Sequence, residues 1–126
     1  MAEFNRDVPI TAKIVFYCEK IEQATLRFGN TMEAFKSDFD FRSVCAMYII
    51  QIGELATALT EEFRQKYNEV PWRLIRGMRN VFAHDYHHLD VEETWKTIEA
   101  DIPILRAYCE KILQKERYGK SEDNGA

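Results

Sequence analysis

The stretch FRSVCAMYIIQIGELATALTEEF, from Phe41 to Phe63, decides the fold of this chain. Its apolar residues recur every three or four positions, which is the spacing that lines one side of an α-helix. The pattern predicts a long, largely buried helix from about Asp40, with the inward residues Val44, Met47, Tyr48, Leu55 and Leu59. Glycine inside a helix costs roughly 1 kcal/mol relative to alanine, so we expect a neighbouring helix to pack closely at Gly53.

The same helical spacing precedes this stretch. Asp7 is a candidate N-cap for a first helix with Pro9 in its opening turn, and Gly29-Asn30 should end that helix. Its expected buried residues are Ile10, Ile14, Tyr17, Ile21 and Leu26. Thr31, followed by Ala34 and Phe35, indicates a short helix between the two long ones.

Two further helices are expected after the central one. The first begins near Pro71 and places Ile75, Met78 and Phe82 inward. Asp90 and Glu93 form a candidate capping box for the last helix, which Pro103 should kink. Its apolar residues are Val91, Trp95, Ile98, Ile102, Leu105, Tyr108 and Ile112.

The chain as a whole reads as one helical domain. It has 126 residues, of which 46% are hydrophobic and 30% charged, with only five glycines and three prolines. We therefore expect an all-α, up-and-down bundle of about five helices over residues 1–116. Residues 117–126 have no apolar periodicity and are expected to form a mobile C-terminal tail.

Composition also narrows the location and the class of function. No apolar run approaches the roughly 20 residues of a membrane span, and the N-terminus has no secretion pattern. The three scattered cysteines, Cys18, Cys45 and Cys109, indicate free thiols, so we expect a cytoplasmic protein. The net charge of −4 argues against coating nucleic acid through bulk electrostatics. Any contact with nucleic acid must therefore be local, where basic side chains gather: Arg73, Arg76, Arg79, His84, His87 and His88.

Within that region, the segment RNVFAHDY from Arg79 to Tyr86 combines three useful side chains. Arginine binds phosphate oxygens with two parallel donors, histidine exchanges a proton near neutral pH, and tyrosine offers a hydroxyl that can be modified. On an ideal helix Arg79 and His84 point about 140° apart. They converge only if the helix ends near His84 or if a second subunit completes the site.

Each of these residues also has a structural interpretation. Arg79 alone could be a solvated charge or part of a salt bridge, and His84 could cap the last carbonyls of its helix. Tyr86 could pack as an ordinary aromatic residue. Arg73 and Arg76 could be ordinary residues of a polar helix face, and the alternative is that they contact a nucleic-acid backbone.

The arrangement of arginine, asparagine, histidine and tyrosine in this segment resembles the motif of the HepT-like HEPN ribonuclease toxins. The likeness extends to IGELA (52–56), to VPWRLIRGMRNVFAH (70–84) and to ETW (93–95), so it covers nearly the whole chain. The resemblance implies a homodimeric HEPN bundle in which the two motif helices face each other across a cleft.

The resemblance further implies a metal-independent ribonuclease that cleaves RNA, either mRNA or tRNA, as the toxin of a type VII HepT/MNT toxin-antitoxin system. His84 would act as general acid or base, Arg79 would stabilise charge on the phosphoryl oxygens, and Asn80 would orient His84 or the phosphate. Arg73 and Arg76 would contact the RNA backbone. We expect neither a metal nor another cofactor, because the histidines lack a matched set of cysteine or aspartate ligands.

A partner is implied in the same way: an MNT-type nucleotidyltransferase antitoxin that transfers AMP from ATP to Tyr86. A tethered phosphate beside Arg79 would occupy the site of the RNA phosphate. Two alternatives stay open, namely a non-catalytic HEPN module that binds a nucleotide or a nucleotidyltransferase as an adaptor, and a helical dimerisation domain. Arg79 and His84 favour the enzyme, whereas the roles of His87 and His88 are open.

Overall fold

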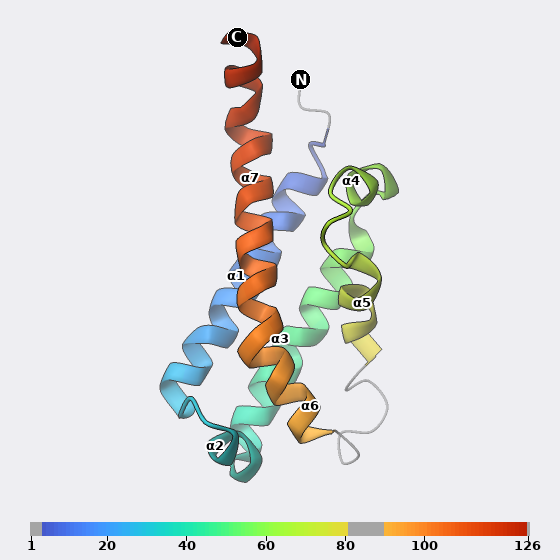
Figure 1. Ribbon diagram of the computed structural model, residues 1–126. Helices are drawn as coiled ribbons and strands as arrows, with labels where there is room; N and C mark the ends of the chain where they lie inside the picture. The colour runs from blue at the N-terminus through green and yellow to red at the C-terminus, as the bar shows by residue number, and fades with distance from the viewer. Residues whose placement is uncertain (1–3, 81–89, 126) are drawn as a thin grey trace.

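The computed structural model describes residues 4–80 and 90–125, with side chains described up to Tyr118 (Figure 1). All regular structure in these ranges is helical, which confirms the expected all-α class. Three long helices dominate the bundle: α1 (Asp7–Phe28), α3 (Phe39–Ala58) and α7 (Ile102–Gly125). The shorter elements are α2 (Met32–Ser37), α4 (Glu61–Lys66), α5 (Trp72–Gly77), the 3-10 turn η1 (Met78–Asn80), α6 (Val91–Lys96) and the π-helical turn η3 (Thr97–Asp101).

One core holds these helices together. Helix α1 packs along both α3 and α7, and α3 also contacts α5 and η1. In Figure 1, α2 and α6 lie at the lower end of the bundle, and α4 lies near the upper end. The most deeply buried side chains come from the three long helices and from α2 and α4, including Ile14, Ile21, Phe35, Phe41, Ile52, Phe63 and Ile102. Helix α5, which leads into the proposed motif, is therefore anchored on the central helix.

The central helix is shorter than the sequence pattern predicts. Helix α3 ends at Ala58, residues 59–60 are extended, and α4 begins at Glu61. The Thr60 hydroxyl caps α4 by accepting a hydrogen bond from Phe63 N at 3.3 Å. Leu59 is buried as expected, but Met47 is 53% exposed, because the side of α3 that carries it is not covered by the described residues.

The first helix has the expected bounds but a different role for its first residue. Helix α1 ends before Gly29, whose φ of +119° is a conformation that other residues rarely adopt. Asp7 does not cap α1: its buried carboxylate accepts hydrogen bonds from the backbone N and the hydroxyl of Thr60, both at 2.7 Å. Hydrogen bonds to a charged group stabilise by roughly 1.5–3 kcal/mol each, so Asp7 fixes the break between α3 and α4. Leu26, expected in the core, is 82% exposed.

The C-terminal helices follow the predicted pattern with one interruption. Asp90 Oδ1 accepts a hydrogen bond from Glu93 N at 3.0 Å, so Asp90 caps α6 as predicted. Proline lacks an amide donor and crowds the carbonyl one turn earlier. Accordingly, the helix widens into the π-helical turn η3, which ends at Asp101, two residues before Pro103. Helix α7 then continues to Gly125, so residues 117–125, expected as a tail, extend the helix; a domain boundary at residue 116 stays a prediction.

The three cysteines are free, as expected, and the structure places all three in the core. Burial raises the pKa of Cys45 and Cys109 to about 12 and also raises that of Cys18, because a thiolate is poorly solvated in the core. Neutral buried thiols are unreactive, so we assign all three to packing. None of the helices in the described part of the chain is long and apolar enough to cross a membrane.

Candidate active site at the crossing of α3 and η1

Arg79 lies where η1 crosses the central helix. Helix α5 begins after Pro71 and tightens into η1, which carries Arg79 against α3. A Cβ atom placed on Gly53 would lie 2.5 Å from Arg79 N and 2.9 Å from Arg79 Cβ, closer than real side chains allow. The predicted close packing at Gly53 is confirmed, and the neighbour that requires it is Arg79 itself.

The side chain of Arg79 is bound to the same helix. Its Nη1 donates a hydrogen bond to Thr57 Oγ1 at 3.0 Å. The Thr57 hydroxyl in turn donates to the Gly53 carbonyl oxygen at 2.9 Å. Gly53 and Thr57 are four residues apart and therefore neighbours on one face of α3. Together Gly53 and Thr57 hold both the backbone and the guanidinium of Arg79. We call these two residues the Arg79 seat.

Among the described residues, Arg79 has no salt-bridge partner. Within residues 4–80 and 90–118, the ion pairs are Lys36–Glu92, Lys66–Glu116, Lys96–Glu93, Arg106–Glu22 and Arg106–Glu110, and none includes Arg79. In the same ranges, no group of three or more metal-ligating side chains is placed to hold an ion. Arg79 is half-buried beside a neutral hydroxyl, so no described carboxylate offsets its charge.

The other candidate residues are placed only in part. Arg73 and Asn80 are exposed, and Arg76 is half-buried. The Nε atom of Arg76 is buried and has no hydrogen-bond acceptor in the described part of the chain. An unpaired buried donor costs about 1–3 kcal/mol, so such a nitrogen is unusual in a folded protein. Two predicted residues, His84 and Tyr86, lie outside the described residues, as do His87, His88 and Phe82.

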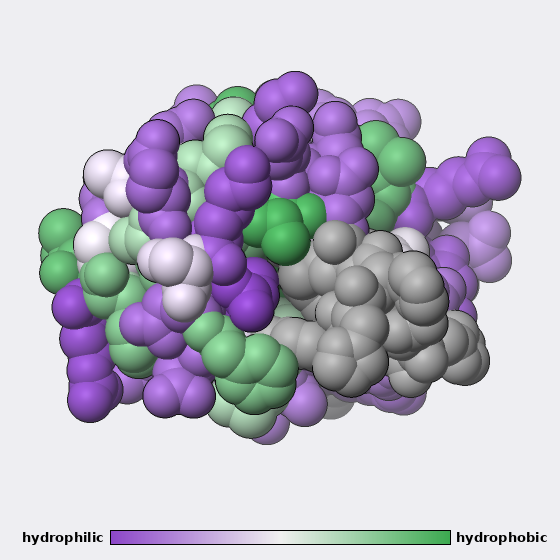
Figure 2. Space-filling model, turned by 90° about the horizontal axis from the view of Figure 1, so that it is seen from below, coloured by the Kyte–Doolittle hydropathy of each residue, from purple (hydrophilic) through white to green (hydrophobic). Residues whose placement is uncertain are grey.

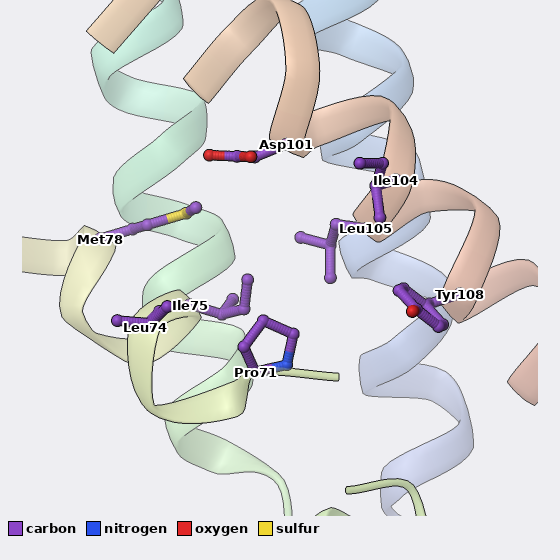
Figure 3. A pocket seen from close by; sticks show the side chains of 8 residues that line it. All are labelled: Pro71, Leu74, Ile75, Met78, Asp101, Ile104, Leu105 and Tyr108. Atoms are coloured by element: carbon purple, nitrogen blue, oxygen red, sulfur yellow. The ribbon is translucent and has the colours of Figure 1, made fainter. Parts of the chain in front are cut away.

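An apolar hollow of about 150 Å³ lies on the side of α5 that faces α7 (Figure 3). Its lining is Pro71, Leu74, Ile75, Met78, Asp101, Ile104, Leu105 and Tyr108. None of the candidate arginines, nor Asn80, contributes to this lining. The hollow is therefore separate from the Arg79 seat.

The fold and the site define an all-helical bundle of the HEPN type, with a motif arginine seated on the central helix. The Ribonuclease HepT-like family matches residues 16–112, and the chain belongs to this family.

Several curated proteins that the chain resembles are named as ribonucleases. The chain is 42% identical over 66 residues to "Putative RNase TTE0752" of Caldanaerobacter subterraneus subsp. tengcongensis, a match that covers 52% of this chain and 59% of the relative. It is 38% identical over 61 residues to "Probable ribonuclease HepT" of Thermococcus cleftensis, covering 48% of this chain and 56% of that protein. It is 28% identical over 96 residues to "Putative RNase MJ1380" of Methanocaldococcus jannaschii, covering 69% of this chain and 88% of that protein. The first two matches thus span less than two thirds of those relatives. No solved structure gives a significant match to the chain.

Proposed function

We propose that this protein is a metal-independent endoribonuclease. The observation that carries the proposal is the Arg79 seat: the motif arginine is fixed by a glycine crossing and a neutral hydroxyl, with no described carboxylate beside it. A guanidinium held in this way keeps its charge for an incoming phosphate, which it binds with two parallel hydrogen bonds. Membership of a family named for ribonuclease activity supports the same conclusion.

The proposed reaction is an internal transfer at one RNA phosphodiester. The ribose 2′-oxygen bonds to the adjacent phosphorus and loses its proton to a base. The bond from phosphorus to the 5′-oxygen of the next nucleotide breaks, and that oxygen gains a proton from an acid. His84 serves in one of these proton transfers, and Arg79 stabilises the charge on the non-bridging oxygens. The products are a 2′,3′-cyclic phosphate and a 5′-hydroxyl.

The remaining polar residues have supporting roles in this proposal. Asn80 follows Arg79 directly and orients His84 or the phosphate. Arg76 lies about one turn before Arg79, and its buried Nε has no hydrogen-bond acceptor among the described residues. Arg73 is exposed one turn earlier, where it can contact the backbone of a bound RNA.

The experiment that tests this function is the cleavage of end-labelled RNA in excess chelator. We expect fragments that carry 2′,3′-cyclic phosphates, and a rate about 10²–10⁴-fold lower for His84→Ala, because a positioned acid or base contributes that much. Fragments that end in 3′-hydroxyls would contradict the mechanism. The absence of cleavage by the wild-type protein would favour the non-catalytic adaptor function.

The proposed regulation is AMPylation of Tyr86 by an MNT-type nucleotidyltransferase, as in a type VII toxin-antitoxin pair. The tyrosine oxygen would bond to the α-phosphorus of ATP, pyrophosphate would leave, and the phenol proton would pass to solvent. The new phosphate would compete with RNA for Arg79. Mass spectrometry after incubation with the nucleotidyltransferase and ATP should locate AMP on Tyr86 and find none on Tyr86→Phe. AMP located only on other residues would overturn the assignment.

We also propose that the chain acts as a homodimer in the cytoplasm. The resemblance to the HepT-like HEPN family implies a site that a second copy completes. Large apolar side chains lie exposed on the described surface, among them Phe16, Leu26, Met47, Leu74 and Ile104. Figure 2 shows such apolar groups, in green, among hydrophilic ones at one end of the molecule. Sedimentation should give twice the chain mass of 14.9 kDa, and a single-chain mass at assay concentrations would exclude the dimer.

A further inference from the structure

We propose that Thr57 is a positioning residue for Arg79, because it sets the orientation of the guanidinium that meets the RNA phosphate. The inference rests on the ribonuclease function proposed above. It concerns a residue of the central helix that lies 22 positions before Arg79 in the sequence and gives no sign of function there.

The two partners of the Thr57 hydroxyl determine which hydrogen bond it donates and which it accepts. A hydroxyl has one hydrogen to donate and two lone pairs that accept. Its hydrogen points to the Gly53 carbonyl oxygen, 2.9 Å away, so a lone pair is left for Arg79 Nη1 at 3.0 Å. Threonine is β-branched, and in a helix this bond to the carbonyl four residues earlier selects one of its two favoured rotamers. The acceptor for Arg79 is thus held in place by the helix itself.

This arrangement determines which part of Arg79 faces a ligand. The crossing at Gly53 fixes the backbone of Arg79, but an unbound arginine side chain still samples many rotamers. The bond from Nη1 to Thr57 removes much of that freedom. Within the described residues, no hydrogen bond engages Nε or Nη2 of Arg79. These two atoms form one edge of the planar guanidinium, an edge that suits two oxygens of one phosphate.

Two matched variants separate positioning from simple packing. Thr57→Val keeps the shape of the side chain and removes the acceptor, whereas Thr57→Ser keeps the hydroxyl. We expect Thr57→Val to lower kcat for RNA cleavage on the order of 10-fold, since small displacements of a group that acts in the transition state are costly. KM should change little, because the interaction strengthens in the transition state. Thr57→Ser should restore most of the rate, and equal losses in both variants would overturn the proposal.

A double-mutant cycle tests whether Thr57 acts through Arg79. In an Arg79→Ala background, Thr57→Val should lower the cleavage rate no further, because the group that it positions is gone. A packing role would instead give the same loss in both backgrounds and would overturn the proposal. Melting temperatures of all variants show whether each chain is folded at the assay temperature.

A measurement without RNA keeps this proposal distinct from the ribonuclease function. In ¹⁵N NMR spectra, the guanidinium signals of Arg79, assigned by their loss in Arg79→Ala, should show restricted rotation about Cζ–Nη1. Thr57→Val should release that rotation, and Thr57→Ser should retain it. Unchanged Arg79 signals in Thr57→Val would overturn the positioning role. Absence of RNA cleavage by the wild-type protein, with these NMR changes present, would overturn the function and leave the contact to Thr57 established.

Discussion

Replacement of Arg79 by alanine should lower the rate of RNA cleavage about 10²–10³-fold, the loss typical of removing one preorganised donor from a charged transition state. The expected loss is in kcat, because the guanidinium acts on charge that develops as the phosphodiester reacts. Arg79→Lys keeps the charge but loses the two-pronged geometry, so it should recover only part of the rate. Cleavage of end-labelled RNA under single-turnover conditions measures all three proteins.

Arg106→Ala is the matched control for the loss of a positive charge. Arg106 pairs with Glu22 and Glu110 away from the Arg79 seat, and exposed pairs of this kind contribute about 1 kcal/mol or less to stability. This variant should cleave RNA at close to the wild-type rate. A similar loss in Arg106→Ala and Arg79→Ala would show that net charge, and not the seated guanidinium, governs the rate.

Gly53→Ala should nearly abolish cleavage although it changes no residue that touches RNA. The new Cβ would lie 2.5 Å from Arg79 N, which is backbone and cannot rotate away, so η1 must move. A displacement of about 1 Å at a reacting group can cost on the order of 10²-fold in rate. Overpacking should also lower the free energy of unfolding by about 1–3 kcal/mol, against a gain in helix propensity of roughly 1 kcal/mol. Urea denaturation and the RNA assay measure the two effects.

Gly77→Ala provides the control for the same substitution two residues before Arg79. A Cβ at Gly77 meets nothing within 4 Å, and the residue lies at the end of helix α5. Its cleavage rate should match that of the wild-type protein, and its stability should be equal or slightly higher. Full activity of Gly53→Ala, or equal defects in the two variants, would contradict the claim that close packing at Gly53 positions Arg79.

The parts of the fold that the sequence predicts are those set by local spacing. Helical periodicity correctly placed α1, and an unfavourable glycine inside a helix correctly predicted the crossing at Gly53. The break after Ala58 was not predictable in this way, because it is fixed by Asp7, which lies 53 residues before its partner Thr60. Exposure of Leu26 and Met47 has a similar cause: which side of a helix is covered depends on the neighbours that the fold supplies.

In the candidate site, too, one residue could be predicted from the sequence and another could not. Arg79 stands out in the sequence because of its motif, but Thr57 lies between two alanines and has no motif of its own. The contact between Thr57 and Arg79 is visible only in the fold, where η1 packs against α3 and Gly53 lies one turn before Thr57. A search for small residues and hydroxyls four positions apart on a helix expected to be crossed could have suggested it. The convergence of Arg79 with His84, and the AMPylation of Tyr86, stay predictions.

The most direct test of the central claim is the single-turnover cleavage rate of labelled RNA in excess chelator, measured side by side for the wild-type protein and Arg79→Ala. If the seated arginine serves a metal-independent ribonuclease, the wild-type protein cleaves under these conditions and the variant does so about 10²–10³-fold more slowly. Equal rates for the two proteins, or no cleavage by the wild-type protein, would contradict it.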